Sequence, residues 1–101
     1  MESPSLRFAA AVRTLGDTAR ARQLRMPTFR SPPGLADVHR SIRRRGGTAT
    51  VAIALRDRPW PAVLADMIEG VVVANRLSGV EADRARADLW AAVAEPLGTA
   101  A

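Results

Sequence analysis

The chain has 101 residues, of which 48% are hydrophobic and 25% are charged, and its net charge is +5. This length suffices for one domain with a single hydrophobic core, and the composition is typical of a globular chain rather than a disordered one. The absence of cysteine excludes disulfides and thiolate metal sites. No apolar run is long enough for a signal peptide or a membrane span, so we expect a cytoplasmic protein with no membrane partner.

Positive charge is concentrated in the first part of the chain. All fifteen basic residues are arginine, a bias typical of GC-rich genomes. Up to Arg58 the chain carries twelve arginines and four acidic residues, a net charge of +8. The remainder carries three arginines and six acidic residues, a net charge of −3. This asymmetry indicates either an anionic partner for the first part or head-to-tail self-association.

A helix is predicted near the N-terminus, because Ser3 is a suitable N-cap and Pro4 suits the first helical position. Its apolar stripe is narrow and rich in alanine, and we expect Gly16–Asp17 to break or weaken it. We therefore expect residues 1–25 to form a loosely attached helical segment beside a single α+β domain over residues 26–98. Met26 offers an alternative initiator, which leaves open whether the segment belongs to the native protein.

Extended chain and a β-hairpin are predicted next. The prolines of Met26–Gly34 exclude a helix and favour extended chain with a short edge strand around Phe29. We expect Phe29 in the core, with base stacking as the alternative. Gly46–Gly47 has the composition of a two-residue turn between two extended segments. The turn predicts a register in which Ile42 faces Val51, Arg40 faces Ile53 and Val38 faces Leu55.

The two strands of this hairpin differ in character. The second alternates apolar and small residues, which predicts a buried face formed by Val51, Ile53 and Leu55. The first, over Val38–Arg45, is polar and is expected near an edge of the sheet. The register makes the outer face basic and open, with His39, Ser41, Arg43, Arg45, Thr48, Thr50 and Arg56 on it.

The longest apolar stripe predicts a central helix over Pro59–Leu77, capped by Asp57. The spacing of six residues is that of a helix packed on the hairpin: Trp60, Val63, Leu64, Met67, Ile68 and Val71. Three further apolar residues of this helix lie outside the stripe that packs on the hairpin. We expect the C-terminal helix or a second subunit to cover them: Val72, Val73 and Leu77. Asn75 also lies in this arc, where it bonds free carbonyl groups or faces an interface.

A second helix follows after a tight turn. Ser78 and Glu81 have the spacing of a capping box, and Pro96 and Gly98 are expected to end the helix. Asp83–Arg86 and Arg84–Asp88 have the spacing of surface ion pairs. Together the elements predict an α+β fold in which a β-hairpin packs on an αα-hairpin, with an additional N-terminal helix.

The residue inventory argues against an enzyme. The chain has no cysteine and no tyrosine, and its only histidine, His39, has no partner pattern for acid–base or nucleophilic catalysis. Asp66 and Glu69 could touch a hard cation, but such a pair is common on solvated helices. Arg45–Thr48 lacks the lysine of a phosphate-binding loop. We expect no catalytic residue, no metal site and no cofactor.

Nucleic-acid binding is the function that the sequence favours. Three arginines at the tip of the hairpin and three nearby could contact phosphates, in a salt-dependent and largely sequence-independent manner. The residues expected to do so are Arg40, Arg43, Arg44, Arg45, Arg56 and Arg58. The partner would be DNA or RNA. The alternative is a homodimeric interaction or assembly module without a nucleic-acid role, whose interface would include Val72, Val73 and Leu77.

Overall fold

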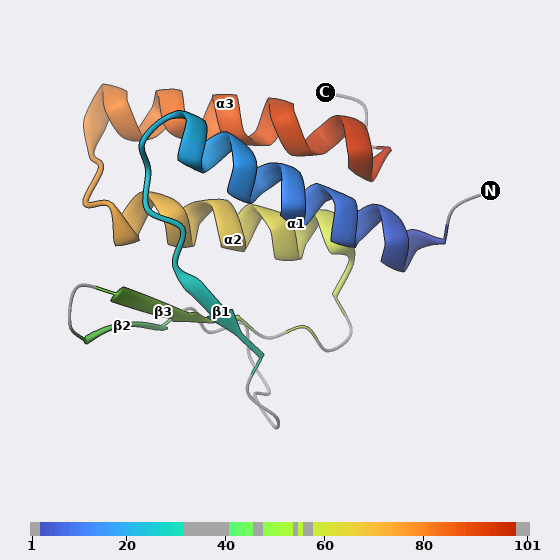
Figure 1. Ribbon diagram of the computed structural model, residues 1–101, viewed down its shortest axis with the longest axis horizontal. Coiled ribbons are helices and arrows are strands. Elements are labelled where there is room, and N and C mark those ends of the chain that lie inside the picture. Colours follow the sequence, from blue (N-terminus) through green and yellow to red (C-terminus); the bar gives the residue numbers. More distant parts are fainter. Residues whose placement is uncertain (1–2, 32–40, 46–47, 54, 56–57, 99–101) are drawn as a thin grey trace.

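The computed structural model describes residues 3–31, 41–45, 48–53, 55 and 58–98. Within them, three helices lie on one side of a small sheet (Figure 1), which confirms the predicted α+β class. In chain order the elements are α1 (Pro4–Ala21), β1 (Thr28–Arg30), β2 (Ser41–Arg45), β3 (Thr48–Ala52), α2 (Trp60–Ala74) and α3 (Gly79–Leu97).

The described sheet has the strand order β1-β3-β2. β2 and β3 are antiparallel, and Ile42 faces Val51 while Arg45 faces Thr48, which confirms the predicted hairpin register. β1 adds a third strand, parallel to β3, with Phe29 beside Val51. The predicted short strand around Phe29 is therefore present. The turn at residues 46–47 and the pairs predicted for residues 38 and 40 lie outside the described residues.

The first helix is longer than its sequence suggests. Ser3 caps it as predicted, since the Ser3 hydroxyl accepts a hydrogen bond from the Leu6 N–H at 3.2 Å. The helix then continues through Gly16–Asp17 to Ala21, so the predicted break is wrong. A glycine inside a helix lowers stability by only about 1 kcal/mol relative to alanine. Burial of the neighbouring Leu15 side chain contributes more than that to the stability of the fold.

The helix α1 shares one core with the rest of the chain. Ala11, Leu15 and Ala19 are fully buried in the cluster that also contains the central side chains of α2, α3 and β3. Phe8 stacks on Trp60 of α2, with ring centroids 4.5 Å apart and planes inclined by 23°. The loose attachment predicted for residues 1–25 concerns stability and stays a prediction. The packing supports the opposite expectation.

The helix α2 buries the predicted stripe and approaches the sheet closely at Gly70. Val63, Leu64 and Val71 are at most 1% exposed. A Cβ atom at Gly70 would lie 3.1 Å from Val51 Cγ1 and 3.2 Å from Phe29 Cε1. These distances are at the short limit of van der Waals contact, so the absence of a side chain lets the helix lie this near the strands.

Two helices end in the same way. In α2, the Leu77 N–H donates to the Val72 carbonyl at 3.1 Å and the Arg76 N–H donates to the Val73 carbonyl at 3.0 Å. Arg76 has a left-handed φ of 55°. This is a Schellman motif, in which the residue after the left-handed position contacts the last turn. Leu77 accordingly packs against the cluster of Val72. The end of α1 repeats the pattern, with Leu24 bonded to the Ala19 carbonyl at 2.8 Å.

The helix α3 departs from the prediction at both ends. Ser78 occupies the N-cap, but its side chain makes no capping hydrogen bond, so the predicted capping box is not formed. Glu81 still lies in the first turn, where a carboxylate interacts favourably with the helix dipole. Pro96 lies inside the last turn instead of ending the helix. The end comes at Gly98, whose φ of 80° suits a glycine cap.

The burial of α1 gives the first prediction. Leu15→Ala should lower the free energy of unfolding by about 2–5 kcal/mol, because it opens a cavity in the shared core. Leu6→Ala, at a position of the same helix that is 61% exposed, should change it by no more than about 0.5 kcal/mol. Urea denaturation of both variants measures the difference. Equally small effects would show that residues 1–25 are loosely attached.

Candidate functional site

The arginine cluster predicted at the hairpin lies on β2, an outer strand of the described sheet. Arg43, Arg44 and Arg45 pair in register with Thr50, Ala49 and Thr48 of β3. The backbone thus places three consecutive arginines along one edge, opposite small uncharged residues. Two further members of the predicted site, Arg40 and Arg56, lie outside the described residues.

Arg58, the sixth predicted member, is bound within the fold. Its guanidinium donates to Asp66 Oδ2 at 2.8 Å and to the Ala62 carbonyl at 3.4 Å. The side chains of Arg58 and Asp66 are only 13% and 22% exposed. Arg58 therefore connects the chain before α2 to the polar side of that helix and does not present its charge to an external partner.

Glu69 is likewise occupied by an arginine. Arg86 of α3 donates to both Glu69 oxygens, from Nε at 2.9 Å and from NH2 at 2.7 Å, and to Asp83 Oδ1 at 3.0 Å. The bond to Glu69 raises the pKa of Arg86 above its ordinary value, so this guanidinium stays charged. The Asp83–Arg86 pair is as predicted. Asp66 and Glu69 both serve ion pairs, which leaves the cation site considered from the sequence without support.

A further acidic group of the helices, Asp88, is also paired. Asp88 of α3 pairs with Arg22 at the end of α1, at 2.6 Å, and not with Arg84 as its spacing suggested. Over the part of the chain that the structure describes, no group of three histidine or acidic side chains could hold a metal ion. Ion pairs with Arg58, Arg86 and Arg22 thus involve both carboxylates of α2 and Asp88 of α3.

The predicted interface residues divide between the inside and the outside of the fold. Val72 is 1% exposed and packs against Ala82 and Ala85 of α3, so the C-terminal helix covers it. Leu77 is half-buried in the same cluster. Val73 is different, because it is 44% exposed on α2. Of the three, Val73 is the one that presents a substantial apolar surface to a partner.

Asn75 joins two distant parts of the chain. Its side chain accepts from the Arg25 N–H at 2.8 Å, and its amide donates to the Arg25 carbonyl and the Val71 carbonyl, each at 2.8 Å. The first of the two alternatives for Asn75 is thus confirmed in part: it bonds carbonyl groups, although the Val71 carbonyl also accepts the Asn75 backbone N–H at 3.1 Å. The second connection, to the segment entering β1, had no signal in the sequence because Arg25 lies fifty positions away.

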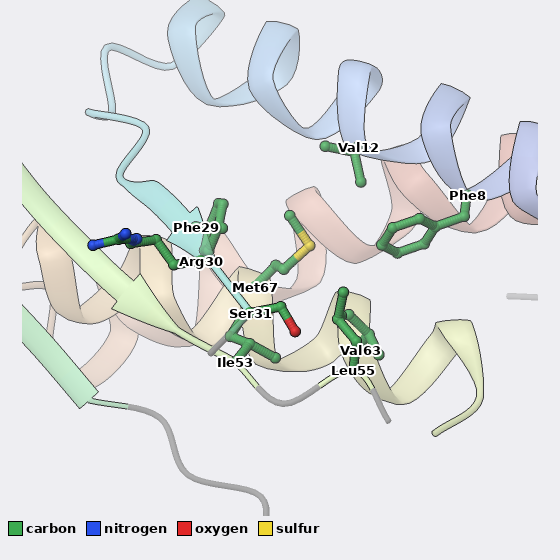
Figure 2. A pocket seen from close by; sticks show the side chains of 9 residues that line it. All are labelled: Phe8, Val12, Phe29, Arg30, Ser31, Ile53, Leu55, Val63 and Met67. Carbon is green, nitrogen blue, oxygen red and sulfur yellow. The ribbon is translucent and has the colours of Figure 1, made fainter. Parts of the chain in front are cut away.

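An apolar cavity that the sequence did not reveal opens between α1, α2 and the ends of β1 and β3. Its volume is about 170 Å³, and it is lined by Phe8, Val12, Phe29, Arg30, Ser31, Ile53, Leu55, Val63 and Met67. Figure 2 shows the Arg30 guanidinium pointing away from the other lining side chains, while the Ser31 hydroxyl points among them. Among the described residues that line the cavity there is no pair of acid–base groups.

Arg30 is a site residue that the sequence analysis missed. In β1 the outer residues Thr28 and Arg30 are exposed and Phe29 between them is partly buried. Phe29 packs on the core, so the base-stacking alternative for it is wrong. The sequence could have indicated this position. Side chains alternate between the two faces of a strand, so an inward Phe29 in a strand over Thr28–Arg30 requires an outward Arg30.

Comparisons with protein-family models, with curated proteins and with solved structures yield no match to this chain. None of the helices in the described ranges is long and apolar enough to cross a membrane.

Proposed function

We propose that this chain is a small cytoplasmic, non-enzymatic binding protein whose arginine-bearing hairpin contacts an anionic partner, nucleic acid first. The observation that supports this most is the separation of charge between layers. The three described strands contain four arginines and no acidic residue: Arg30, Arg43, Arg44 and Arg45.

Three carboxylates of α2 and α3 form ion pairs with arginines outside the three strands. Asp66, Glu69 and Asp88 pair with Arg58, Arg86 and Arg22. We therefore assign the contact with an external anion to the arginines of the strands. Phosphate groups on a regular backbone suit arginines carried along a strand at the edge of a sheet, and binding of this kind is strongly dependent on salt and largely independent of sequence.

A catalytic role has no support in the side chains. The chain offers one histidine and neither cysteine nor tyrosine. Asp66 and Glu69 of α2 each accept hydrogen bonds from an arginine. Binding is therefore the class of function proposed.

Replacing Arg43, Arg44 and Arg45 together by alanine tests the proposal. If each arginine contacts one phosphate, the slope of log affinity against log salt concentration should fall by about 2–3 on generic duplex DNA. Fluorescence anisotropy from about 50 to about 200 mM salt measures both affinity and slope.

The matched control removes the same charge from the helical layer. Arg13, Arg20 and Arg84 are exposed on α1 and α3; Arg20 lies 3.8 Å from Asp17 and donates from Nε to the Gly16 carbonyl of its own helix at 3.3 Å. Their triple alanine variant should retain most of the affinity and nearly all of the slope. Equal losses in both variants would mean that total charge, and not the hairpin, determines binding. An unchanged slope in the hairpin variant would contradict the proposal.

The alternative is a homodimeric assembly module in which the arginines only confer solubility. Its supporting observation is apolar exposure beside the α2–α3 turn, where Val73 is 44% exposed and Val80 is 71% exposed. Small domains often bury such groups in a two-fold dimer.

Light scattering tests this alternative. At tens of micromolar the protein should have the mass of a dimer, and Val73→Asp should convert it to a monomer because a charge at an apolar interface is costly. Leu6→Asp, on an exposed position of α1, should leave the dimer intact. A monomeric mass for the unmodified protein would rule out the dimer.

A further inference from the structure

The outer face of the sheet is uncovered by the helices, which lie together on its other side (Figure 1). Val51 and Ile53 point inward and are at most 2% exposed. Because side chains alternate along a strand, Thr50 and Ala52 belong to the opposite face. Thr28 and Arg30 of β1 are exposed beside them.

The register joins these positions into rows across the three strands. Thr28 is beside Thr50, and Thr50 is opposite Arg43. Arg30 is beside Ala52, and Ala52 is opposite Ser41. Arginine positions thus lie on both outer strands, with small residues on the central strand between them. Neighbouring strands are about 4.8 Å apart, so the outer two are separated by about 10 Å.

Over the residues that the structure describes, this face carries no ring on which a base could stack; His39, which the sequence predicts on it, lies outside those residues. The four aromatic residues other than histidine all pack against the core: Phe8, Phe29, Trp60 and Trp90. Proteins that hold single strands on a sheet depend on exposed aromatic side chains for much of their affinity. The described part of the sheet has no exposed aromatic side chain for stacking. A nucleic acid would therefore be held there by contacts to its phosphates and by close approach of small side chains to its groove.

Resting on the proposed function, we infer that the partner is double-stranded DNA, bound with the outer face of the sheet toward the major groove. Arg30 would contact the phosphates of one strand, and β2, which carries Arg43, would lie toward the other. The major groove of B-form DNA is about 12 Å wide, which suits outer strands about 10 Å apart with Thr50 and Ala52 between them. The major groove of A-form RNA is too deep and narrow for such a sheet.

The first test compares three ligands with the unmodified protein. Duplex DNA of about two helical turns should bind about tenfold or more tightly than the corresponding single strand or duplex RNA, measured by anisotropy at equal salt. Dimethyl sulfate footprinting should show protection of guanine N7, in the major groove, and none of adenine N3, in the minor groove. Equal binding of the three ligands, or protection of adenine N3 alone, would overturn the inference.

The second test isolates Arg30. Arg30→Ala should lower the salt slope on duplex DNA by about 1 and weaken affinity several-fold, whereas Arg30→Lys should retain the slope. Arg13→Ala, an exposed arginine of α1, is the matched control and should change neither. Urea denaturation of each variant shows whether the fold is unchanged.

The outcomes separate this inference from the proposed function. Suppose that the salt slope falls in the triple variant of Arg43, Arg44 and Arg45 but does not change in Arg30→Ala. The proposal of nucleic-acid binding would then stand, and the inference that β1 takes part in the contact would be wrong. No salt-dependent binding to any of the three ligands would overturn both.

Discussion

The contact between α2 and the sheet at Gly70 is the interaction on which the rest of the structure depends. A Cβ at this position would lie 3.1–3.2 Å from Val51 and Phe29, so the helix backbone lies almost directly on the two strands. The strands contain only three to five residues each. An isolated hairpin of that size is marginally stable in water and needs a packed layer on one face. The arginine-bearing face can exist only because the opposite face is held by α2.

The remaining helices fix the position of α2. α1 and α3 contribute buried side chains to the same core, among them Leu15 and Leu89, which are fully buried. Asn75 holds both backbone groups of Arg25, which sets where the chain leaves the helical layer and enters β1. β1 then places Phe29 beneath Gly70 and Arg30 on the other face. The position of Arg30 is thus determined by contacts within the helical layer.

Patterns with a short period were predictable from the sequence, and contacts between distant residues were not. The hairpin register follows from one two-residue connection, and the α2 stripe follows from helical spacing, so both were correct. The break expected at Gly16 was wrong because burial of Leu15 on distant helices outweighs a local propensity. The partners of Arg58 and Asn75 in the fold could not be predicted, since Asp66 and Arg25 become their neighbours only in the folded chain. Val72 and Leu77 do not pack on the hairpin. Val72 is buried against α3, and Leu77 packs beside it because the Schellman motif at the end of α2 turns it toward the last turn.

The measurement that tests the central contact most directly compares alanine at two helical glycines. A Cβ at Gly16 would meet only the flexible end of Arg20, at 3.3 Å, whereas one at Gly70 would meet Val51 and Phe29. Alanine stabilises a helix by roughly 1 kcal/mol relative to glycine. Gly16→Ala should therefore raise the free energy of unfolding by most of that amount. Gly70→Ala should gain nothing or lose stability in urea denaturation, because the sheet must move to admit the methyl group. An equal gain at both positions would show that α2 does not press on the sheet.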